Sequence, residues 1–262
     1  MTISTKDQIR QQVRERYAGI AEGKSCSCCS APQESAKLGY SEQELHGVPE
    51  GADMGLGCGN PQAIAALKPG ETVLDLGCGG GFDCFLAAKQ VGDSGLVIGT
   101  DMTAEMISKA RANAEKCGAT NVSFRLGEIE HLPVADSSVD VIISNCVINL
   151  SPDKAQVFSE AFRVLKPGGR LAISDVVAIK PLPDKTIRNL DQYCGCVSGA
   201  ITVKEQERIL RETGFANIRV TTKPASREII RTWFPGSGVE NYVLSAEITA
   251  VKPGGKSCKT EK

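Results

Sequence analysis

The chain has 262 residues and a formal net charge of −1, and no stretch is rich enough in Lys and Arg to form a nucleic-acid footprint. Its length suits one large α/β domain with an accessory part, so disulfides are not needed to hold it together. The first 20 residues lack an apolar signal-peptide run, and no segment approaches the length of a membrane span. We therefore expect a cytoplasmic protein that binds neither nucleic acid nor membranes, and a monomer, because no coiled-coil repeat suggests a dimer.

The chain begins with a predicted amphipathic helix over residues 6–20, where Ile9, Val13 and Tyr17 fall at helical spacing. Residues 21–60 are rich in Gly, Ser, Pro and Cys, and this composition predicts loops and turns.

From residue 72 onward, short apolar runs alternate with amphipathic segments. The predicted strands cover residues 72–77, 96–101, 121–128, 139–145 and 170–177, and the predicted helices cover 82–92, 103–118 and 154–169, the last with a Pro-Gly-Gly stop. This alternation predicts an α/β fold with a mostly parallel, doubly wound sheet that is covered by helices on both faces.

Past residue 178 the alternation loosens. The pattern predicts an inserted cap over 178–200, a helix over 203–215 and late strands over 217–220 and 242–252. We divide the chain into a Cys-rich N-terminal segment over 1–66 that covers the active site, a core over 67–251 and a disordered tail over 252–262.

The first predicted strand ends in a glycine-rich turn, DLGCGGG at residues 75–81. Glycines in such a turn let the backbone approach a ligand closely. The turn lacks the G-x-G-x-x-G spacing of a dinucleotide site, because counting from Gly77 places Phe82 at the last glycine position. The second predicted strand ends at Asp101, where a carboxylate can accept two hydrogen bonds from ribose hydroxyls.

The acidic-x-G-x-G-x-G spacing resembles motif I of the class I S-adenosylmethionine (SAM) methyltransferases, and GEIEHLP at 127–133 and LKPGG at 165–169 extend the resemblance. It covers most of residues 68–250 and implies a Rossmann-like fold with SAM as cosubstrate. It also implies that Glu128 contacts the adenine amino group and that Ile129 packs on the adenine ring. The cofactor-binding residues that it implies are Asp75, Gly77, Cys78, Gly79, Asp83, Asp101, Met102, Glu128, Ile129 and Asn145.

Eleven cysteines are present, and in a reducing compartment they are more often ligands, nucleophiles or buried small hydrophobes than structural bridges. Ligands bind at the carboxyl ends of parallel strands. Cys146 follows a predicted strand directly, Cys194 and Cys196 lie in the cap, and Cys58 lies in a glycine-rich loop before the core. We expect packing roles, not chemistry, for Cys78, Cys84, Cys117 and Cys258.

The chemistry of this thiol set favours one kind of substrate. Thiolates are soft ligands, but zinc fits poorly, because structural zinc sites use paired C-x₂-C units and four closed ligands. Trivalent arsenic takes three sulfurs in a pyramid and keeps a lone pair that can attack a sulfonium methyl group. Such a transfer depends mainly on proximity and alignment, and it needs no general base.

The segments GLGCGNP, ISNCVINLSPDK and CGCVSGA, together with an upstream Cys pair, resemble the arsenite SAM methyltransferases. This resemblance implies that Cys58, Cys146 and Cys196 are the arsenic ligands and that Cys28 or Cys29 is a redox thiol. When that thiol forms a disulfide, the two electrons released would re-reduce the methylated product. Thioredoxin or glutathione would then reduce the disulfide back to thiols. Cys26 competes with Cys28 and Cys29 for the redox role, and Cys194 is a near neighbour of Cys196.

Two other functions remain open. A quinone- or sterol-type carbon methyltransferase would need an apolar acceptor pocket and a base. A non-catalytic, thiol-based sensor of arsenic or metal would bind arsenite without consuming SAM. A DNA amino-methyltransferase is disfavoured, since no N/D-P-P-Y segment or basic patch is present.

Overall fold

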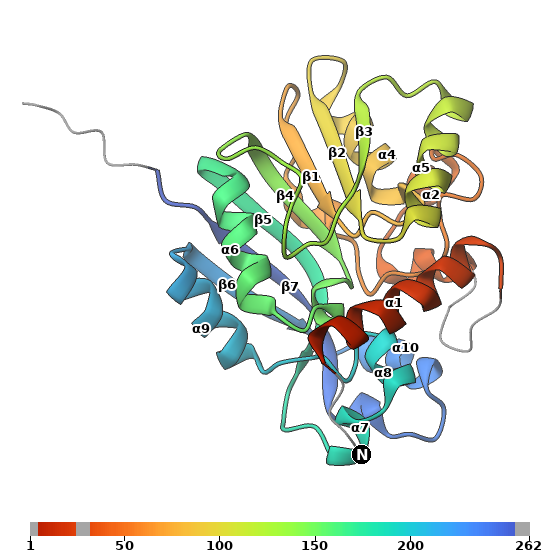
Figure 1. Cartoon of the computed structure of the whole chain (residues 1–262), viewed down its shortest axis with the longest axis vertical. Helices are drawn as coiled ribbons and strands as arrows, with labels where there is room; N and C mark the ends of the chain where they lie inside the picture. Colours follow the sequence, from red (N-terminus) through yellow and green to blue (C-terminus); the bar gives the residue numbers. More distant parts are fainter. Residues whose placement is uncertain (1–4, 25–31, 255–262) are drawn as a thin grey trace, which may run out of the picture.

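The computed structural model describes residues 5–24 and 32–254, and it confirms the α/β, Rossmann-like fold (Figure 1). One sheet has the strand order β3-β2-β1-β4-β5-β7-β6. Its strands are β1 (Thr72–Leu76), β2 (Leu96–Asp101), β3 (Val122–Leu126), β4 (Val139–Asn145), β5 (Leu165–Ala178), β6 (Ala216–Lys223) and β7 (Val243–Val251). Strands β1 to β5 pair in parallel, whereas β7 pairs antiparallel with both β5 and β6. The strand order changes direction between β1 and β4, which places a ligand crevice at their carboxyl ends.

Helices cover both faces of the sheet. The α-helices are α1 (Lys6–Ala21), α2 (Glu42–His46), α3 (Gln62–Ala65), α4 (Phe82–Val91), α5 (Ala104–Cys117), α6 (Lys154–Val164), α7 (Asp184–Ile187), α8 (Leu190–Cys194), α9 (Val203–Thr213) and α10 (Ser226–Trp233), and the 3₁₀ helices are η1 (Pro32–Leu38), η2 (Ile148–Leu150) and η3 (Val239–Asn241). In the described ranges no helix is both long enough and apolar enough to cross a bilayer.

Side-chain alternation along the strands separates two parts of the core. Leu74 and Ile142 belong to the cluster that includes the buried faces of α6 and α9. Val73 and Val141 belong to the cluster that includes α4 and α5. Because successive strand residues point to opposite faces, these neighbours along β1 and β4 hold different helices in place.

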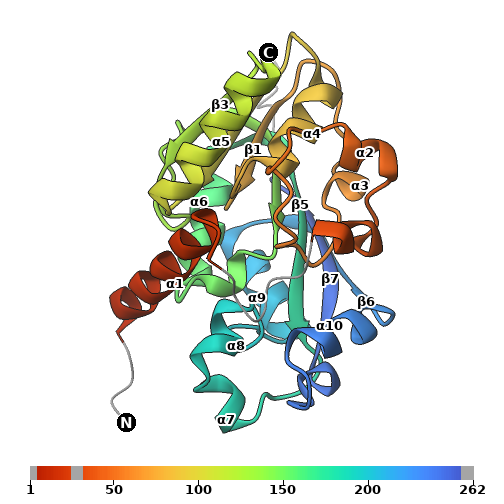
Figure 2. The same cartoon turned by 90° about the vertical axis from the view of Figure 1, so that its right-hand side faces the viewer.

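Helix α1 lies across the edge of the sheet where the crevice opens, and both views place the small helices α7 and α8 below it (Figures 1 and 2). Thr5 caps the helix, because its hydroxyl accepts from the Gln8 N–H at 3.2 Å while the Gln8 side chain accepts from the Thr5 N–H at 2.8 Å. The helix packs on α5, and Val13 is its fully buried residue.

The structure differs from the sequence prediction at three places. The helix expected over 154–169 ends at Val164, and β5 begins at Leu165, because a residue before proline, here Lys166, is biased toward extended backbone. Residues 21–60 contain the short helices η1 and α2, and the latter begins at a capping box between Ser41 and Glu44. Helices α3 and α10 also lie in segments where no helix was expected.

Candidate active site

The glycine loop connects β1 to α4, and three of its glycines have a left-handed backbone, with φ of 68° at Gly77, 51° at Gly79 and 92° at Gly81. A Cβ atom on Gly77 would lie 2.4 Å from Cγ2 of Val147, and one on Gly81 would lie 2.8 Å from Cε2 of Phe85. At Gly79 no atom outside the adjoining residues would come nearer than 4.0 Å. Gly77 and Gly81 are therefore required for packing, whereas Gly79 leaves its backbone open to the pocket.

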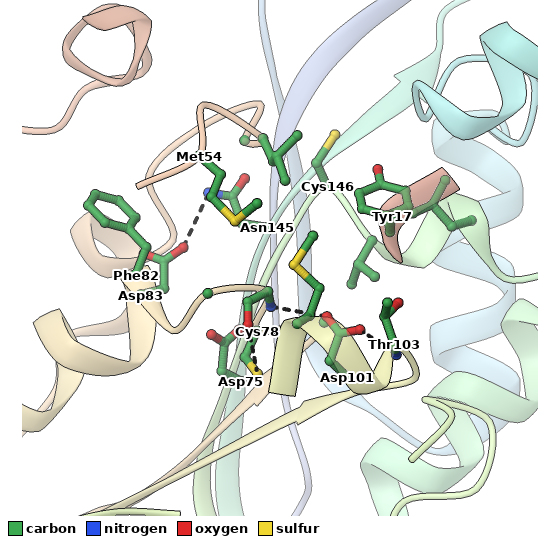
Figure 3. Close-up of a pocket in the computed structure, with 18 of the residues that line it drawn as sticks. Tyr17, Met54, Asp75, Cys78, Phe82, Asp83, Asp101, Thr103, Asn145 and Cys146 are labelled. Atoms are coloured by element: carbon green, nitrogen blue, oxygen red, sulfur yellow. Dashed lines mark hydrogen bonds between the residues drawn. The ribbon is translucent and has the colours of Figure 1, made fainter. Parts of the chain in front are cut away.

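Asp101 lies at the end of β2, opposite the glycine loop (Figure 3). One carboxylate oxygen accepts from the Gly79 N–H at 3.0 Å and the other accepts from the Thr103 N–H at 2.8 Å. Burial raises the pKa of Asp101, and the N–H groups of Thr103 and Gly79 oppose this shift. Each carboxylate oxygen has a second lone pair, so the group can still accept hydrogen bonds from a ligand.

A buried hydrogen-bond network connects the N-terminal segment to the core. The Tyr40 hydroxyl donates to Asp83 at 2.9 Å and accepts from Nδ2 of Asn145 at 2.9 Å. Nδ2 of Asn145 also donates to the Gly59 carbonyl at 2.9 Å, and Nε2 of Gln62 donates to the Asp83 carbonyl at 2.9 Å. Burial raises the pKa of Asp83 to about 6, against the hydrogen bonds from Tyr40, Asn145 and Gln62.

A large pocket lies between the glycine loop, helix α1 and Cys146 (Figure 3). Of the residues assigned to the cofactor from the sequence, its lining includes Asp75, Gly77, Cys78, Gly79, Asp83, Asp101, Met102, Ile129 and Asn145. Asp75 is buried, and this burial raises the pKa of its carboxyl well above the ordinary value.

Glu128 is not among the described residues that line this pocket. Its carboxylate faces helix α1, at 3.0 Å from Arg14 and 3.6 Å from Arg10. Glu130 lines the pocket instead, and its buried carboxylate accepts from Nε of Arg10 at 3.1 Å and from Oγ of Ser151 at 2.7 Å.

The residues that are present fit SAM. The open backbone of Gly79 leaves room for the amino-acid part, and the Asp101 carboxylate can accept hydrogen bonds from the ribose hydroxyls. Met102, Met106 and Ile129 form an apolar part of the lining that suits a flat aromatic ring.

Cys58, Cys146 and Asp175 form a buried group in which the two Sγ atoms and a carboxylate oxygen all lie within 4.8 Å of one another. Cys146 follows β4 directly, and its N–H donates to the Ser174 carbonyl at 2.8 Å. The Cys58 N–H donates to Oδ1 of Asn145 at 3.0 Å, and its Sγ donates to the same Ser174 carbonyl at 3.5 Å. The ends of β4 and β5 therefore position both thiols.

Cys196 reaches the same region from the turn after α8. Its Sγ donates to the Cys146 carbonyl at 2.6 Å. Cys146, Cys194 and Cys196 line a second, smaller cavity together with Tyr17 and Trp233. Cys146 also lines the large pocket, so this residue lies where the two cavities meet.

The thiols of Cys58 and Cys146 are buried, and this keeps them protonated. Burial raises the pKa of Cys58 to about 11, although a contact with Cys146 opposes the shift. A contact with Cys196 lowers the pKa of Cys146, but the contact with Cys58 and burial outweigh it, so the net pKa is well above the ordinary value. The Cys58 and Cys146 thiols are therefore neutral near pH 7.

Several residues of the site were missed by sequence reasoning. Asp175 lies within β5, in the segment ISDVV, and an acidic residue near the carboxyl end of a parallel strand is the signal that could have identified it. Tyr40 and Glu130 carry no motif that would distinguish them from surface residues. Cys26, Cys28 and Cys29 lie outside the described residues, so their predicted redox role stays a prediction.

Known proteins resemble this chain in both sequence and structure. Residues 67–214 match the family described as "Methyltransferase domain". An arsenite methyltransferase of Halobacterium salinarum is 53% identical over 94% of this chain and 67% of its own length, and one of Aquipseudomonas alcaligenes is 45% identical over 81% of this chain and 63% of its own length. The crystal structure of an arsenic(III) SAM methyltransferase from Chlamydomonas reinhardtii matches with a TM-score of 0.62 and 34% identity, covering 86% of this chain and 74% of that chain.

The fold and the glycine-loop pocket define a class I SAM-dependent methyltransferase domain. Within that class, the chain belongs to the arsenite methyltransferase family. It spans only about two thirds of the length of the two curated relatives, 67% and 63%.

Proposed function

We propose that this protein transfers a methyl group from SAM to trivalent arsenic held by the thiols of Cys58, Cys146 and Cys196. One observation carries the proposal, the position of Cys146. Its Sγ lies within 4.8 Å of the Cys58 Sγ, its carbonyl accepts from the Cys196 Sγ at 2.6 Å, and it borders the large pocket.

The neutral thiols of Cys58 and Cys146 suit a neutral substrate. Arsenous acid, As(OH)₃, reacts with three thiols to give three As–S bonds and three water molecules, so each thiol proton leaves on a hydroxide of the substrate. No external base is needed, and no charge enters the buried cluster. A divalent cation would instead require thiolate anions, which burial disfavours at Cys58 and Cys146.

The chain's own residues supply position and shelter. SAM, when bound, supplies an electrophilic methyl group on its sulfonium sulfur. Gly79 and Asp101 orient the cosubstrate on one side of the pocket, and Cys146 presents the bound arsenic from the other side (Figure 3). Val13 and Tyr17 of α1 also line the pocket and help to exclude water. The arsenic lone pair attacks the methyl carbon in line, so alignment accounts for most of the rate.

Transfer of the methyl group formally raises arsenic to the pentavalent state, and a return to the trivalent state needs two electrons. The proposed source is a pair of thiols that become a disulfide, one from Cys28 or Cys29 and one from the cluster. A thioredoxin- or glutathione-type reductant would then return that disulfide to two thiols.

The first experiment incubates the reduced protein with SAM, arsenite and a thiol, and separates arsenic species by chromatography with elemental detection. The proposal predicts methylated arsenic. It also predicts that Cys146→Ser forms none while binding SAM as tightly as the wild type. Cys117→Ser is the matched control, because the Cys117 thiol is exposed at the end of α5.

Two outcomes would contradict the proposal. Arsenite binding without consumption of SAM would indicate a sensor, and undiminished turnover in Cys146→Ser would exclude this thiol from the reaction. For the redox step, simultaneous replacement of Cys26, Cys28 and Cys29 by Ser should allow one turnover and stop the following ones with thioredoxin. Unchanged multiple turnover in that variant would exclude the upstream cysteines.

A further inference from the structure

Asp175 accepts hydrogen bonds from the segment that follows Cys146. Its carboxylate accepts from the backbone N–H of Ile148 at 2.9 Å and of Asn149 at 3.3 Å, and from Nδ2 of Asn149 at 2.9 Å. It also accepts from the N–H of Val176 at 2.7 Å. Asp175 is 2% exposed, so these donors replace the water that an ionised carboxylate would otherwise bind.

Asn149 continues the connection from Asp175 to the cap. Its Nδ2 donates to the Val176 carbonyl at 2.6 Å and to the Cys196 carbonyl at 3.3 Å. Gly199 allows this approach, because a Cβ atom there would lie only 2.0 Å from the Asn149 carbonyl oxygen. One buried amide thus connects β5, the turn after β4 and the turn that carries Cys196.

Both ends of this connection hold a cysteine in an unfavourable backbone conformation. Cys146 has a φ of 58° and Cys196 a φ of 63°. The left-handed region costs a non-glycine residue about 1–2 kcal/mol, so surrounding contacts must maintain it.

The three cysteines depend on different contacts. Cys58 and Cys146 are held by Asn145 and by the Ser174 carbonyl, which do not involve Asn149. The turn of Cys196 is joined to the segment after Cys146 by the Asn149 amide, by its own Sγ and by the Tyr193 hydroxyl, which donates to the Leu150 carbonyl at 3.2 Å.

We propose that Asp175 and Asn149 are positioning residues that bring the Cys196 thiol to the other two, so that arsenic is bound by three sulfurs instead of two. This inference rests on the proposed function, since it concerns how the same site holds its substrate. Neither side chain needs to touch arsenic. The Asp175 carboxylate fixes the turn, and the Asn149 amide fixes Cys196 relative to that turn.

The test uses the full chain with arsenite as the probe, and Asn149→Ala as the principal variant. X-ray absorption counts the As–S bonds. Trp233, the single tryptophan of the chain, lines the small cavity and reports arsenite binding by its fluorescence. We expect three As–S bonds in the wild type and two in Asn149→Ala, where loss of one chelating thiol weakens arsenite binding by about tenfold or more. SAM affinity, measured separately, should stay at the wild-type value.

Two further variants keep the test decisive. Asn121→Ala removes a half-buried amide that donates to the Ala88 and Gly92 carbonyls at 3.0 Å. This amide precedes β3, at the opposite end of the parallel strands from Cys146, so the variant should retain three As–S bonds. Asp175→Asn keeps the size of the side chain, but it puts an N–H₂ group where an acceptor is needed. We expect it to lose the third As–S bond as well, and it serves in place of Asn149→Ala if that variant does not fold.

The outcomes separate the two proposals. Three As–S bonds and unchanged affinity in Asn149→Ala or Asp175→Asn would overturn the positioning role. So would a parallel loss of SAM binding in both variants, which would assign Asn149 and Asp175 to the stability of the whole fold. A wild-type protein that does not bind arsenite through three sulfurs would instead overturn the proposed function itself.

Discussion

The cofactor pocket and the cysteine cluster share Cys146, but the chain builds them in different ways. Asp101 is the last residue of β2 and pairs with Leu126 of β3, and the glycine loop that carries Gly79 begins directly after β1. Cys58 and Cys196 lie in loops that side-chain hydrogen bonds hold in place: Asn145 accepts from the Cys58 N–H, and Asn149 donates to the Cys196 carbonyl. The pocket thus depends on backbone geometry, whereas the cluster depends on a few buried polar side chains.

This difference predicts how each region tolerates change. Loss of one side chain should affect the cluster selectively, because each loop has few attachments. Loss of a glycine should affect the pocket and fold stability together, because the glycine loop is part of the core.

The largest expected effect concerns the third thiol. Cys196→Ser should lower the rate of arsenic methylation by about a hundredfold or more, because a hydroxyl is a poor ligand for a soft centre. Cys194→Ser should retain most of the rate, since its Sγ is not the one bonded to the Cys146 carbonyl. Formation of methylated arsenic over time measures both. The reverse order of activities would make Cys194 the third ligand.

The next effect compares two glycines. Gly77→Ala should lower the free energy of unfolding by about 3 kcal/mol, because backbone strain adds to a clash with Val147. Gly79→Ala has only the backbone strain, about 1 kcal/mol, and should weaken SAM binding while arsenite binding persists. Urea unfolding and separate ligand titrations measure these quantities. Equal destabilisation by the two variants would contradict the packing argument.

A smaller effect concerns the attachment of α1. Arg10→Ala should lower the free energy of unfolding by about 2 kcal/mol, because the buried Glu130 carboxylate would keep Ser151 as its remaining side-chain donor. Lys6→Ala removes the exposed ion pair with Asp153 and should change the free energy of unfolding by less than about 1 kcal/mol. Thermal or urea unfolding compares the two variants. A larger loss of stability in Lys6→Ala than in Arg10→Ala would show that burial does not determine the strength of these ion pairs.

The smallest effect is a pH dependence. The pKa of Asp83 is about 6 in the folded chain against an ordinary 3.8, so the folded state binds the proton more tightly than the unfolded state. This group therefore favours folding below pH 3.8 and loses that contribution as the pH rises to about 6. Asp83→Asn should remove this part of the slope in urea unfolding, and the exposed Asp93→Asn should leave it unchanged. A slope in Asp83→Asn that equals the wild-type slope would exclude this carboxyl as a contributor, because the raised pKa of the buried Asp175 carboxyl, also about 6, leaves a part of the slope in either case.

The strands and helices of the core could be predicted, because the apolar runs are short and contain β-branched residues, and those of β1, β2 and β4 are followed by amphipathic helical segments. The carboxyl ends of those strands then identified Asp101 and Cys146 as neighbours of one crevice. The end of the helix before β5 was missed, because the Pro-Gly-Gly stop suggested that the helix continued to Gly169, whereas Lys166 before Pro167 favours an extended backbone.

The contacts that complete the site could not be predicted from the sequence. Tyr40 meets Asp83, and Asn149 meets Cys196, across 43 and 47 residues of chain, and no local pattern signals either contact. Glu128 and Glu130 are two positions apart, and the path of the turn after β3 determines which of the two side chains faces the pocket.

The left-handed backbone of Cys146 and Cys196 has a consequence for how such a chain can change over generations. Glycine would adopt these conformations without strain. Cys146→Gly and Cys196→Gly therefore remove backbone strain from the folded state at the same positions where they remove a thiol. Selection for stability alone would therefore favour loss of the cluster, so under the proposed function it is arsenic binding that keeps a cysteine at each position.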